Sequence, residues 1–156
     1  MKKDIILAGV GGQGILTIAT IIGDAATHAG LNLKQAEVHG MSQRGGDVQS
    51  NLRLSTDLIH SDLIKQGAAD LIISMEPMEA LRYLPYLNKE AWVVTSSHPF
   101  KNIPNYPEEE ALMQELNALK SYDSGARVFS GFTGYQGKGL YWRNTNAEYG
   151  KQASYQ

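Results

Sequence analysis

The strongest constraint on the fold of this 156-residue chain lies in residues 4–30, where an apolar strand, a glycine-rich turn and an amphipathic helix follow one another. The strand reads DIILAGV, and Gly30 stands where a helix C-cap is expected. A second strand is predicted at 31–38, which completes a βαβ unit. The apolar residues of the helix share one face: Ile15, Ile18, Ile22 and Ala26.

Strands and helices continue to alternate along the chain. Residues 47–56 alternate in polarity, which predicts a half-buried strand that is antiparallel or at a sheet edge. Apolar strands are predicted at 70–75 and 91–97, separated by a short helix that begins at Pro77. An amphipathic helix is predicted over 108–122. This alternation predicts an α/β domain, a Rossmann-like three-layer fold with a mostly parallel sheet. The apolar stripe of the last helix is Leu112, Leu116 and Leu119.

Charge and composition exclude several kinds of protein. The net charge of −2 provides no field that would attract nucleic acid or an anionic membrane. The absence of cysteine excludes disulfides, a cysteine nucleophile and thiolate-bound iron–sulfur clusters within this chain. No segment reaches the roughly 18 apolar residues that a membrane span needs, so a cytoplasmic protein is expected.

Composition changes at residue 124. Residues 124–156 hold six of the sixteen glycines and seven of the thirteen aromatic residues, and they carry a net charge of +3, whereas residues 1–123 carry −5. We therefore expect one domain at 1–123 and an atypical tail at 124–156. The tail is expected to be disordered or loosely docked. It could also be an aromatic, basic arm that docks on a partner, or an altered C-terminus.

The glycine turn, residues 9–14, matches the pattern G-x-G-x-x-G between a strand and a helix. Glycines let the backbone approach a ligand, and a helix N-terminus favours an anion. Three interpretations stay open: a dinucleotide site, a tight turn without a ligand, or a turn that meets a cofactor or anionic substrate held mainly by another subunit. The dinucleotide site would need Glu37 at a ribose, but the strand that carries it lacks a continuous apolar run. The candidate binding residues are Gly9, Gly11, Gly12, Gln13 and Gly14.

The stretch EVHGMSQRGG, residues 37–46, places unusual chemistry in one connection. It combines a titratable imidazole, neutral hydrogen-bonding groups, a guanidinium and two glycines that allow close approach. Loops that follow parallel strands line the ligand crevice of such a sheet, so this loop is expected beside the glycine turn. Glu76 ends another strand at the same edge. No catalytic triad, carboxylate pair or metal-binding spacing appears, so no catalytic residue is assigned. The candidate residues of the loop are His39, Ser42, Gln43, Arg44, Gly45 and Gly46.

Taken together, GVGGQG and AEVHGMSQRGG resemble the gamma-type catalytic domain of the 2-oxoacid:ferredoxin oxidoreductases. HGMSQRGG resembles the indolepyruvate branch in particular, in which this domain forms the small (beta) subunit. The segment SMEPMEALRYLPYL also resembles the family. The resemblance covers about residues 3–122, and the tail does not share it.

The resemblance implies an enzyme subunit that is inactive alone. Such enzymes decarboxylate a 2-oxoacid oxidatively with coenzyme A as co-substrate, giving an acyl-CoA, carbon dioxide and reduced ferredoxin. Thiamine diphosphate and iron–sulfur clusters would belong to a large partner subunit, with no cofactor held by this chain alone. The resemblance further implies that Arg44 faces a carboxylate or phosphate at an interface. A stand-alone dinucleotide-binding oxidoreductase and a non-catalytic assembly module remain as alternatives.

Overall fold

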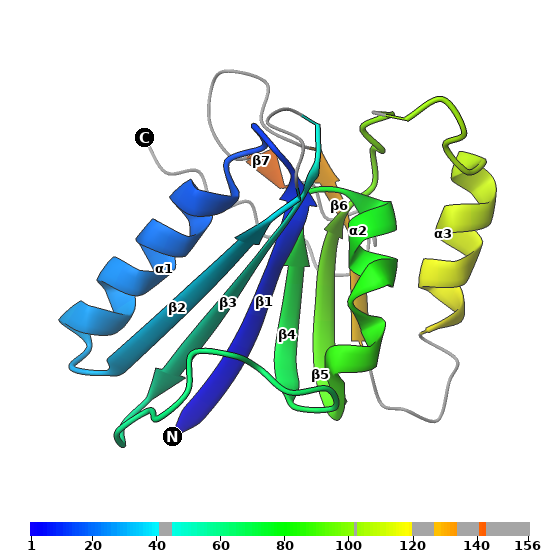
Figure 1. Ribbon diagram of the computed structural model, residues 1–156. Coiled ribbons are helices and arrows are strands. Elements are labelled where there is room, and N and C mark those ends of the chain that lie inside the picture. The colour runs from blue at the N-terminus through cyan, green and yellow to red at the C-terminus, as the bar shows by residue number, and fades with distance from the viewer. Residues whose placement is uncertain (41–44, 102, 120–126, 134–140, 143–156) are drawn as a thin grey trace.

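One mixed sheet forms the centre of the fold (Figure 1). The computed structural model describes residues 1–40, 45–101, 103–119, 127–133 and 141–142. The strands are β1 (Lys2–Val10), β2 (Asn32–His39), β3 (Asp47–Ser55), β4 (Ala69–Ser74), β5 (Leu87–Ser96), β6 (Arg127–Thr133) and β7 (Tyr141–Trp142). Their order across the sheet is β2-β3-β1-β4-β5-β6-β7.

Strand direction confirms the predicted α/β class with a mostly parallel sheet. The pairs β1–β4, β4–β5 and β5–β6 are parallel. Because β3 is antiparallel to both β1 and β2, β2 runs in the same direction as β1. Only β3 and β7 run against the other strands.

The strand predicted at 47–56 is β3, and its antiparallel direction is confirmed. It does not lie at the edge, however. It lies between β1 and β2, the two strands of the predicted βαβ unit, and β2 forms the edge. The loop between β2 and β3 is therefore a hairpin connection.

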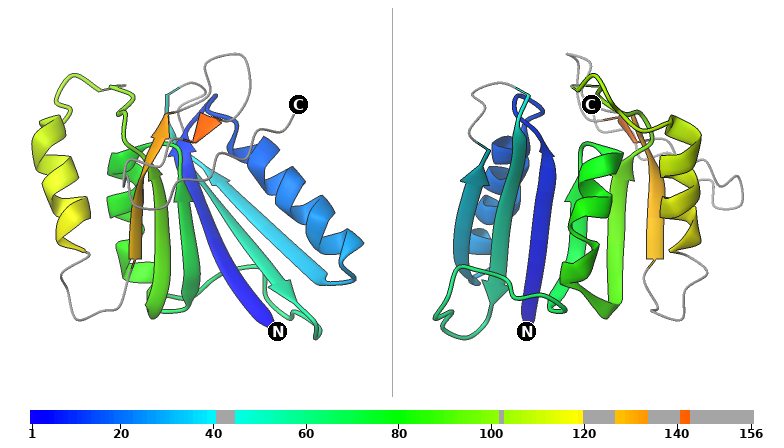
Figure 2. Two further views of the ribbon diagram at one scale, coloured as in Figure 1. Left: turned by 180° about the vertical axis from the view of Figure 1, so that it is seen from behind. Right: turned by 45° about the vertical axis from the view of Figure 1, so that its right-hand side comes forward.

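Helices cover the two faces of the sheet unequally (Figures 1 and 2). On one face, α1 contacts β1, β2 and β3; on the other, α2 contacts β1, β4 and β5, and α3 packs against α2. This arrangement gives the three layers expected from the sequence. No described helix has both the length and the apolar character needed to cross a membrane. The helices are α1 (Ile15–His28), α2 (Pro77–Arg82) and α3 (Glu109–Ala118), with a 3-10 turn, η1 (Leu84–Tyr86).

The buried stripe of α1 differs from the predicted face. Ile15 and Ala26 are buried as expected, but the residues between them on the buried stripe are Ala19 and Gly23. A Cβ at Gly23 would lie 3.0 Å from Leu33 Cδ2, so small residues bring α1 close to β2. The larger Ile18 and Ile22 are consequently displaced to the flank of the helix, where they are only partly buried. For α3 the prediction holds, since Leu112 and Leu116 are buried and Leu119 packs against the same core.

Two strands of the sheet come from the segment predicted to be a tail. β6 pairs with β5, and β7 pairs with β6. The rest of that segment and residues 120–123 lie outside the described residues, so the domain boundary at residue 123 stays a prediction.

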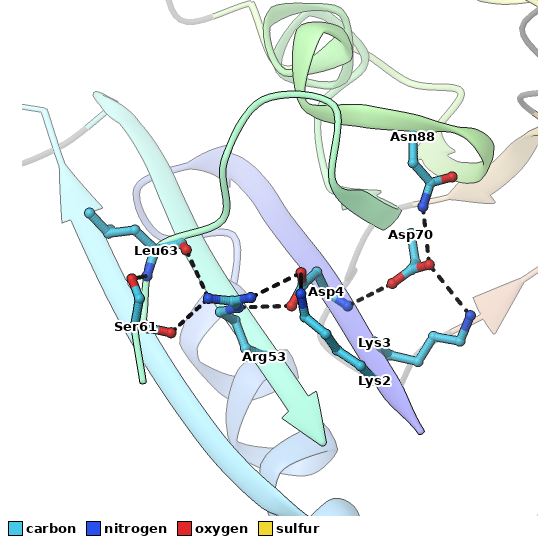
Figure 3. Close-up of polar contacts among 8 residues, drawn as sticks. All are labelled: Lys2, Lys3, Asp4, Arg53, Ser61, Leu63, Asp70 and Asn88. Atoms are coloured by element: carbon cyan, nitrogen blue, oxygen red, sulfur yellow. Dashed lines mark hydrogen bonds and ion pairs between the residues drawn. The ribbon is translucent and has the colours of Figure 1, made fainter. Parts of the chain in front are cut away.

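An ion pair between buried Asp4 and partly buried Arg53 fastens β3 to β1 (Figure 3). Asp4 lies opposite Arg53 in the β1–β3 ladder. Its carboxylate accepts hydrogen bonds from Arg53 Nε at 2.8 Å and Nη2 at 3.2 Å. Arg53 Nη1 also donates to the carbonyls of Ser61 and Leu63 at 2.8 and 3.1 Å. One guanidinium therefore holds two strands and the loop that leads from β3 towards β4.

Asp70 makes a second polar junction beside this ion pair (Figure 3). Its carboxylate accepts the backbone N–H of Asp4 at 2.9 Å and the side-chain amide of Asn88 at 3.1 Å. These contacts join β1, β4 and β5 near the start of the parallel strands, opposite the edge that carries the glycine turn.

Candidate functional site at the carboxyl edge

The carboxyl edge of the sheet, where β1, β4 and β5 end, carries the glycine turn. Gly12 and Gly14 have φ values of 96° and 84°, which favour glycine. Gly14 is the N-cap of α1. Among the described residues, no side chain caps this helix, and its first turn contains no acidic residue. Its first N–H groups therefore keep their capacity to bind an anion.

Gln13 makes the turn rigid from within. Its Oε1 accepts the Val10 N–H at 2.8 Å, and its Nε2 donates to the Met75 carbonyl at 3.4 Å. A Cβ at Gly9 would lie 2.8 Å from that Oε1, so Gly9 makes room for the glutamine. The side chain of Gln13 ties β1 to the end of β4 and does not project to solvent as a ligand-binding amide would.

The described end of the hairpin loop (residues 40–46), Gly45 and Gly46, lies against the glycine turn. The Gly11 N–H donates to the Gly46 carbonyl at 2.9 Å, and a Cβ at Gly11 would lie 3.6 Å from Gly45 N. The predicted proximity of the two loops is therefore confirmed. Its cause is the β1–β3 ladder, which pairs Val10 with Asp47 and continues directly into this contact.

Both ends of the hairpin loop are fixed. The Gly40 N–H donates to the Asp47 carbonyl at 2.9 Å, and a Cβ at Gly40 would lie 2.7 Å from Asp47 Oδ1. At the end of β2, His39 Nε2 contacts Glu37 Oε1 at 2.5 Å. Glu37 thus faces its own strand neighbour, and β3 separates it from β1. β2, which carries Glu37, therefore lies two strand spacings, about 10 Å, from β1 and the glycine turn.

Glu76 is fully buried at the end of β4. Its Oε2 accepts the Glu79 N–H at 3.0 Å and so caps α2, while its Oε1 accepts a hydrogen bond from the Tyr106 hydroxyl. Burial, followed by the bond to Glu76, raises the pKa of Tyr106. Both carboxylate oxygens are thus engaged within the chain, and the bond from Tyr106 to Oε1 fastens the β5–α3 connection to the carboxyl edge.

A second buried carboxylate, that of Glu79, lies on α2. Its oxygens accept from Arg82 Nε at 2.9 Å and Nη2 at 3.3 Å. Burial raises the pKa of Glu79, and the hydrogen bond from Arg82 opposes this effect. The charge of Asp47 on β3 also acts on Glu79, so negative charge gathers on this side of the edge.

The neighbouring Tyr83 provides a test of this environment. Burial, supported by the negative charges of Glu79 and Asp47, raises the pKa of Tyr83 to about 12. Between about pH 10 and that value the unfolded chain loses the proton first, so the free energy of unfolding should fall as pH rises, by on the order of 2 kcal/mol. Urea unfolding across this range should show a shallower pH dependence for Tyr83→Phe. An identical slope in both proteins would contradict a buried, neutral Tyr83.

The structure brings most of the predicted site residues together. Within the glycine turn, Gly11 contacts Gly45 and Gly46, and His39 lies at the end of β2 beside the hairpin loop. Ser42, Gln43 and Arg44 lie outside the described residues. The described residues contain no group of three or more His, Cys, Asp or Glu side chains that could hold a metal ion.

Sequence reasoning missed two polar residues at this edge, Tyr106 and Glu79. Tyr106 stands in a proline-spaced loop without periodicity, and it meets a partner 30 residues away. The only local signal for Glu79 was its place three residues after Glu76, before a short apolar run. That spacing fits a helix N-cap at Glu76 that accepts the Glu79 N–H. Glutamate, however, is not among the preferred N-cap residues, so the sequence did not indicate it.

Comparison with known proteins identifies the family. Residues 4–130 match the family model of pyruvate ferredoxin/flavodoxin oxidoreductase. The chain is 44% identical to an indolepyruvate oxidoreductase subunit IorB of Archaeoglobus fulgidus, over 76% of this chain and 61% of that protein. It is 48% identical to the IorB of Thermococcus kodakarensis, over 83% of this chain and 65% of that protein. The chain thus spans less than two thirds of the length of these relatives.

Solved structures agree on the fold. The 2-oxoglutarate:ferredoxin oxidoreductase of Magnetococcus marinus has a TM-score of 0.59 at 17% identity, covering 83% of this chain and 20% of that one. A keto/oxoacid ferredoxin oxidoreductase gamma subunit of Geobacter sulfurreducens has a TM-score of 0.52 at 18% identity, covering 82% of this chain and 60% of that one. The sequence matches and the shared fold place this chain in the pyruvate ferredoxin/flavodoxin oxidoreductase family.

Proposed function

We propose that the chain works in the cytoplasm as the small subunit of a 2-oxoacid:ferredoxin oxidoreductase that prefers indolepyruvate or another aryl pyruvate. One observation carries the choice of substrate class. Four indolepyruvate oxidoreductase subunits are 39–48% identical to this chain, whereas the 2-oxoglutarate synthase subunits are 26–32% identical. The reaction would release carbon dioxide from the 2-oxoacid, transfer the acyl group to coenzyme A and pass two electrons to ferredoxin.

The chemistry of this chain is compatible with a supporting role. Without cysteine it has no thiolates for an iron–sulfur cluster. We therefore assign the clusters and thiamine diphosphate to a large partner subunit, where they would supply electron transfer and carbanion stabilisation. Ferredoxin would be reached through that complex.

The carboxyl edge would contribute a shaped surface. The contact between Gly11 and Gly46 fixes the end of the hairpin loop against the glycine turn. On this proposal the loop presents Arg44 to a carboxylate or phosphate, with Ser42 and Gln43 as hydrogen-bonding neighbours. The exposed side chain of His39 would lie at the border of that surface. Glu76 would support the surface from inside, since both its oxygens are engaged within the chain.

The two alternative functions receive less support. A stand-alone dinucleotide enzyme needs an acidic residue beside the ribose, but β3 separates Glu37 from the glycine turn and His39 contacts its carboxylate. Part of the backbone of the glycine turn also faces the hairpin loop. A non-catalytic assembly module would use the same family fold without touching the substrate, so only activity can distinguish it.

The test of the proposal begins with co-expression of this chain and the large subunit. Pull-down would establish the complex. An anaerobic assay would then follow coenzyme A-dependent reduction of ferredoxin by indolepyruvate, pyruvate and 2-oxoglutarate. We expect turnover only when both chains are present, with indolepyruvate the preferred acid. Activity of either chain alone, or a preference for 2-oxoglutarate, would contradict the proposal.

Replacing Arg44 with alanine should leave the complex intact and reduce kcat/KM at least about 30-fold. The reason is that truncating one partner of a buried charge contact costs about 2–5 kcal/mol. Lys65→Ala, which removes an exposed charge from the loop before β4, is the matched control and should retain full activity. Full turnover by the Arg44 variant in an intact complex would favour the assembly module.

A further inference from the structure

The strands β1 and β4 lie side by side at the point where the fold changes the face on which its helices pack. They are parallel neighbours, and the helices that follow them, α1 and α2, cover opposite faces of the sheet (Figures 1 and 2). In open α/β sheets, the carboxyl ends of two such strands are the place where ligands are normally bound. The side chain that occupies this point therefore bears on what the carboxyl edge can do.

The regular pairing of β1 with β4 stops at this point. The last paired residues are Ala8 and Ser74, and the Met75 N–H still donates to the Ala8 carbonyl at 2.9 Å. The bonds of a parallel ladder are evenly spaced, and every second residue of a strand directs its N–H and C=O groups to the same neighbour. The next bond of this ladder would therefore run from the Val10 N–H to the Met75 carbonyl.

The side-chain amide of Gln13 takes the place of that bond. Its Oε1 accepts the Val10 N–H at 2.8 Å, and its Nε2 donates to the Met75 carbonyl at 3.4 Å. A primary amide carries an acceptor and a donor, so one group bridges the two backbone positions that would otherwise bond to each other. The carboxyl ends of β1 and β4 are consequently held apart by an inserted amide.

The rest of the glycine turn is built around this amide. The Gln13 N–H donates to the Val10 carbonyl at 3.1 Å, so the backbone and the side chain of Gln13 both contact Val10. A Cβ at Gly9 would lie 2.8 Å from Gln13 Oε1, so the space for the amide depends on this glycine. The residue after Val10, Gly11, donates its N–H to the Gly46 carbonyl at 2.9 Å. Gln13 therefore links the end of β4 with the end of the hairpin loop.

We propose that Gln13 is a positioning residue of the carboxyl edge. Its inserted amide sets the separation of β1 and β4, and thereby the placement of Gly11 and Gly46 relative to the start of α2. It acts through these backbone groups and does not touch a substrate. The catalytic consequence rests on the proposed function, whereas the inserted amide is a property of this chain alone.

Turnover by the assembled enzyme tests the positioning role. Gln13→Met keeps the length of the side chain but removes the amide. In the complex with the large subunit it should lower kcat at least about 10-fold and leave KM for the 2-oxoacid within about 2-fold, because a displacement of about 1 Å in a positioned group can cost about 100-fold in rate. Gln13→Glu keeps an acceptor for the Val10 N–H but directs a second oxygen at the Met75 carbonyl, so it should lower kcat as well.

The matched control is Gln66→Met, the same substitution at an exposed position of the loop before β4, and it should retain full kcat. Pull-down would give the amount of complex, so that kcat is expressed per assembled enzyme. A role that is merely structural would reduce the amount of complex and leave this kcat unchanged. Full kcat in either Gln13 variant, or a change confined to KM, would overturn the positioning role.

The inserted amide is tested on the chain alone, which separates its failure from a failure of the proposed function. Gly9→Ala should lower the urea midpoint of the wild-type chain, because the added methyl group meets Gln13 Oε1. In a Gln13→Ala background the same change should lower the midpoint less, since the close contact with Ile15 remains but that with Oε1 is gone. Equal shifts in the two backgrounds would overturn the inserted amide. Unequal shifts together with a complex that turns over no 2-oxoacid would refute the proposed function and leave the inserted amide in place.

Discussion

Replacing Asp4 with alanine should lower the free energy of unfolding by about 3 kcal/mol, the low end for a broken buried ion pair, because it leaves the mostly buried guanidinium of Arg53 without its counter-ion. The side chains of Asp4 and Arg53 are 2% and 14% exposed, so solvent screens their interaction little. The loss should also loosen the loop whose Ser61 and Leu63 carbonyls accept from the same guanidinium. Urea unfolding monitored by circular dichroism would measure the difference.

The controls for Asp4 separate a broken pair from a pair that is replaced. Lys2→Ala removes an exposed ion-pair partner of Asp4 and should change stability by less than about 1 kcal/mol. The double variant Asp4→Leu with Arg53→Met replaces both charges by apolar groups, and it should be markedly more stable than Asp4→Ala. A double variant as unstable as Asp4→Ala would argue against an unpaired charge as the cause.

Replacing Glu76 with alanine should cost about 3 kcal/mol. The cost combines the lost cap of α2 with a Tyr106 hydroxyl that loses its partner and a space left beneath the carboxyl edge. Glu76→Gln should cost less than about 1.5 kcal/mol, because an amide oxygen can still accept the Glu79 N–H and the amide nitrogen can donate to Tyr106. Chemical denaturation would give both values.

Tyr106→Phe is the matched variant for the Glu76 contact. It removes only the hydroxyl, so it should account for about 1–2 kcal/mol of the loss seen for Glu76→Ala, and the two changes should not be additive. Additive losses would mean that Glu76 and Tyr106 stabilise the fold independently. In that case the connection between β5 and α3 would not be held through this pair.

Local patterns were sufficient to predict the first unit of the fold. The apolar run before Gly9 and the helical spacing after Gly14 placed the turn at the end of a strand and the start of a helix, as observed. Pro77 likewise marked the start of α2. In these cases the residues that decide the structure are sequence neighbours, so propensity and periodicity are informative.

Contacts between distant residues could not be predicted in the same way. The alternation in residues 47–56 fitted an antiparallel strand but did not indicate that β3 would lie between β1 and β2, because many registers bury an alternating strand equally well. The Asp4–Arg53 pair depends on that register and joins residues 49 positions apart. Which residues of α1 are buried also depended on how closely the helix packs on the sheet. The close packing buries the small Ala19 and Gly23 in place of their larger neighbours.

The Gly11–Gly46 contact makes one backbone amide a reporter for the carboxyl edge. Its proton is held by the hairpin loop and not by a strand partner, so its exchange with deuterium depends on whether that loop stays in place. The neighbouring amides of β1 are held by the sheet and provide an internal reference. Exchange at this single site, compared before and after another chain docks, would reveal whether docking moves the loop or only covers it.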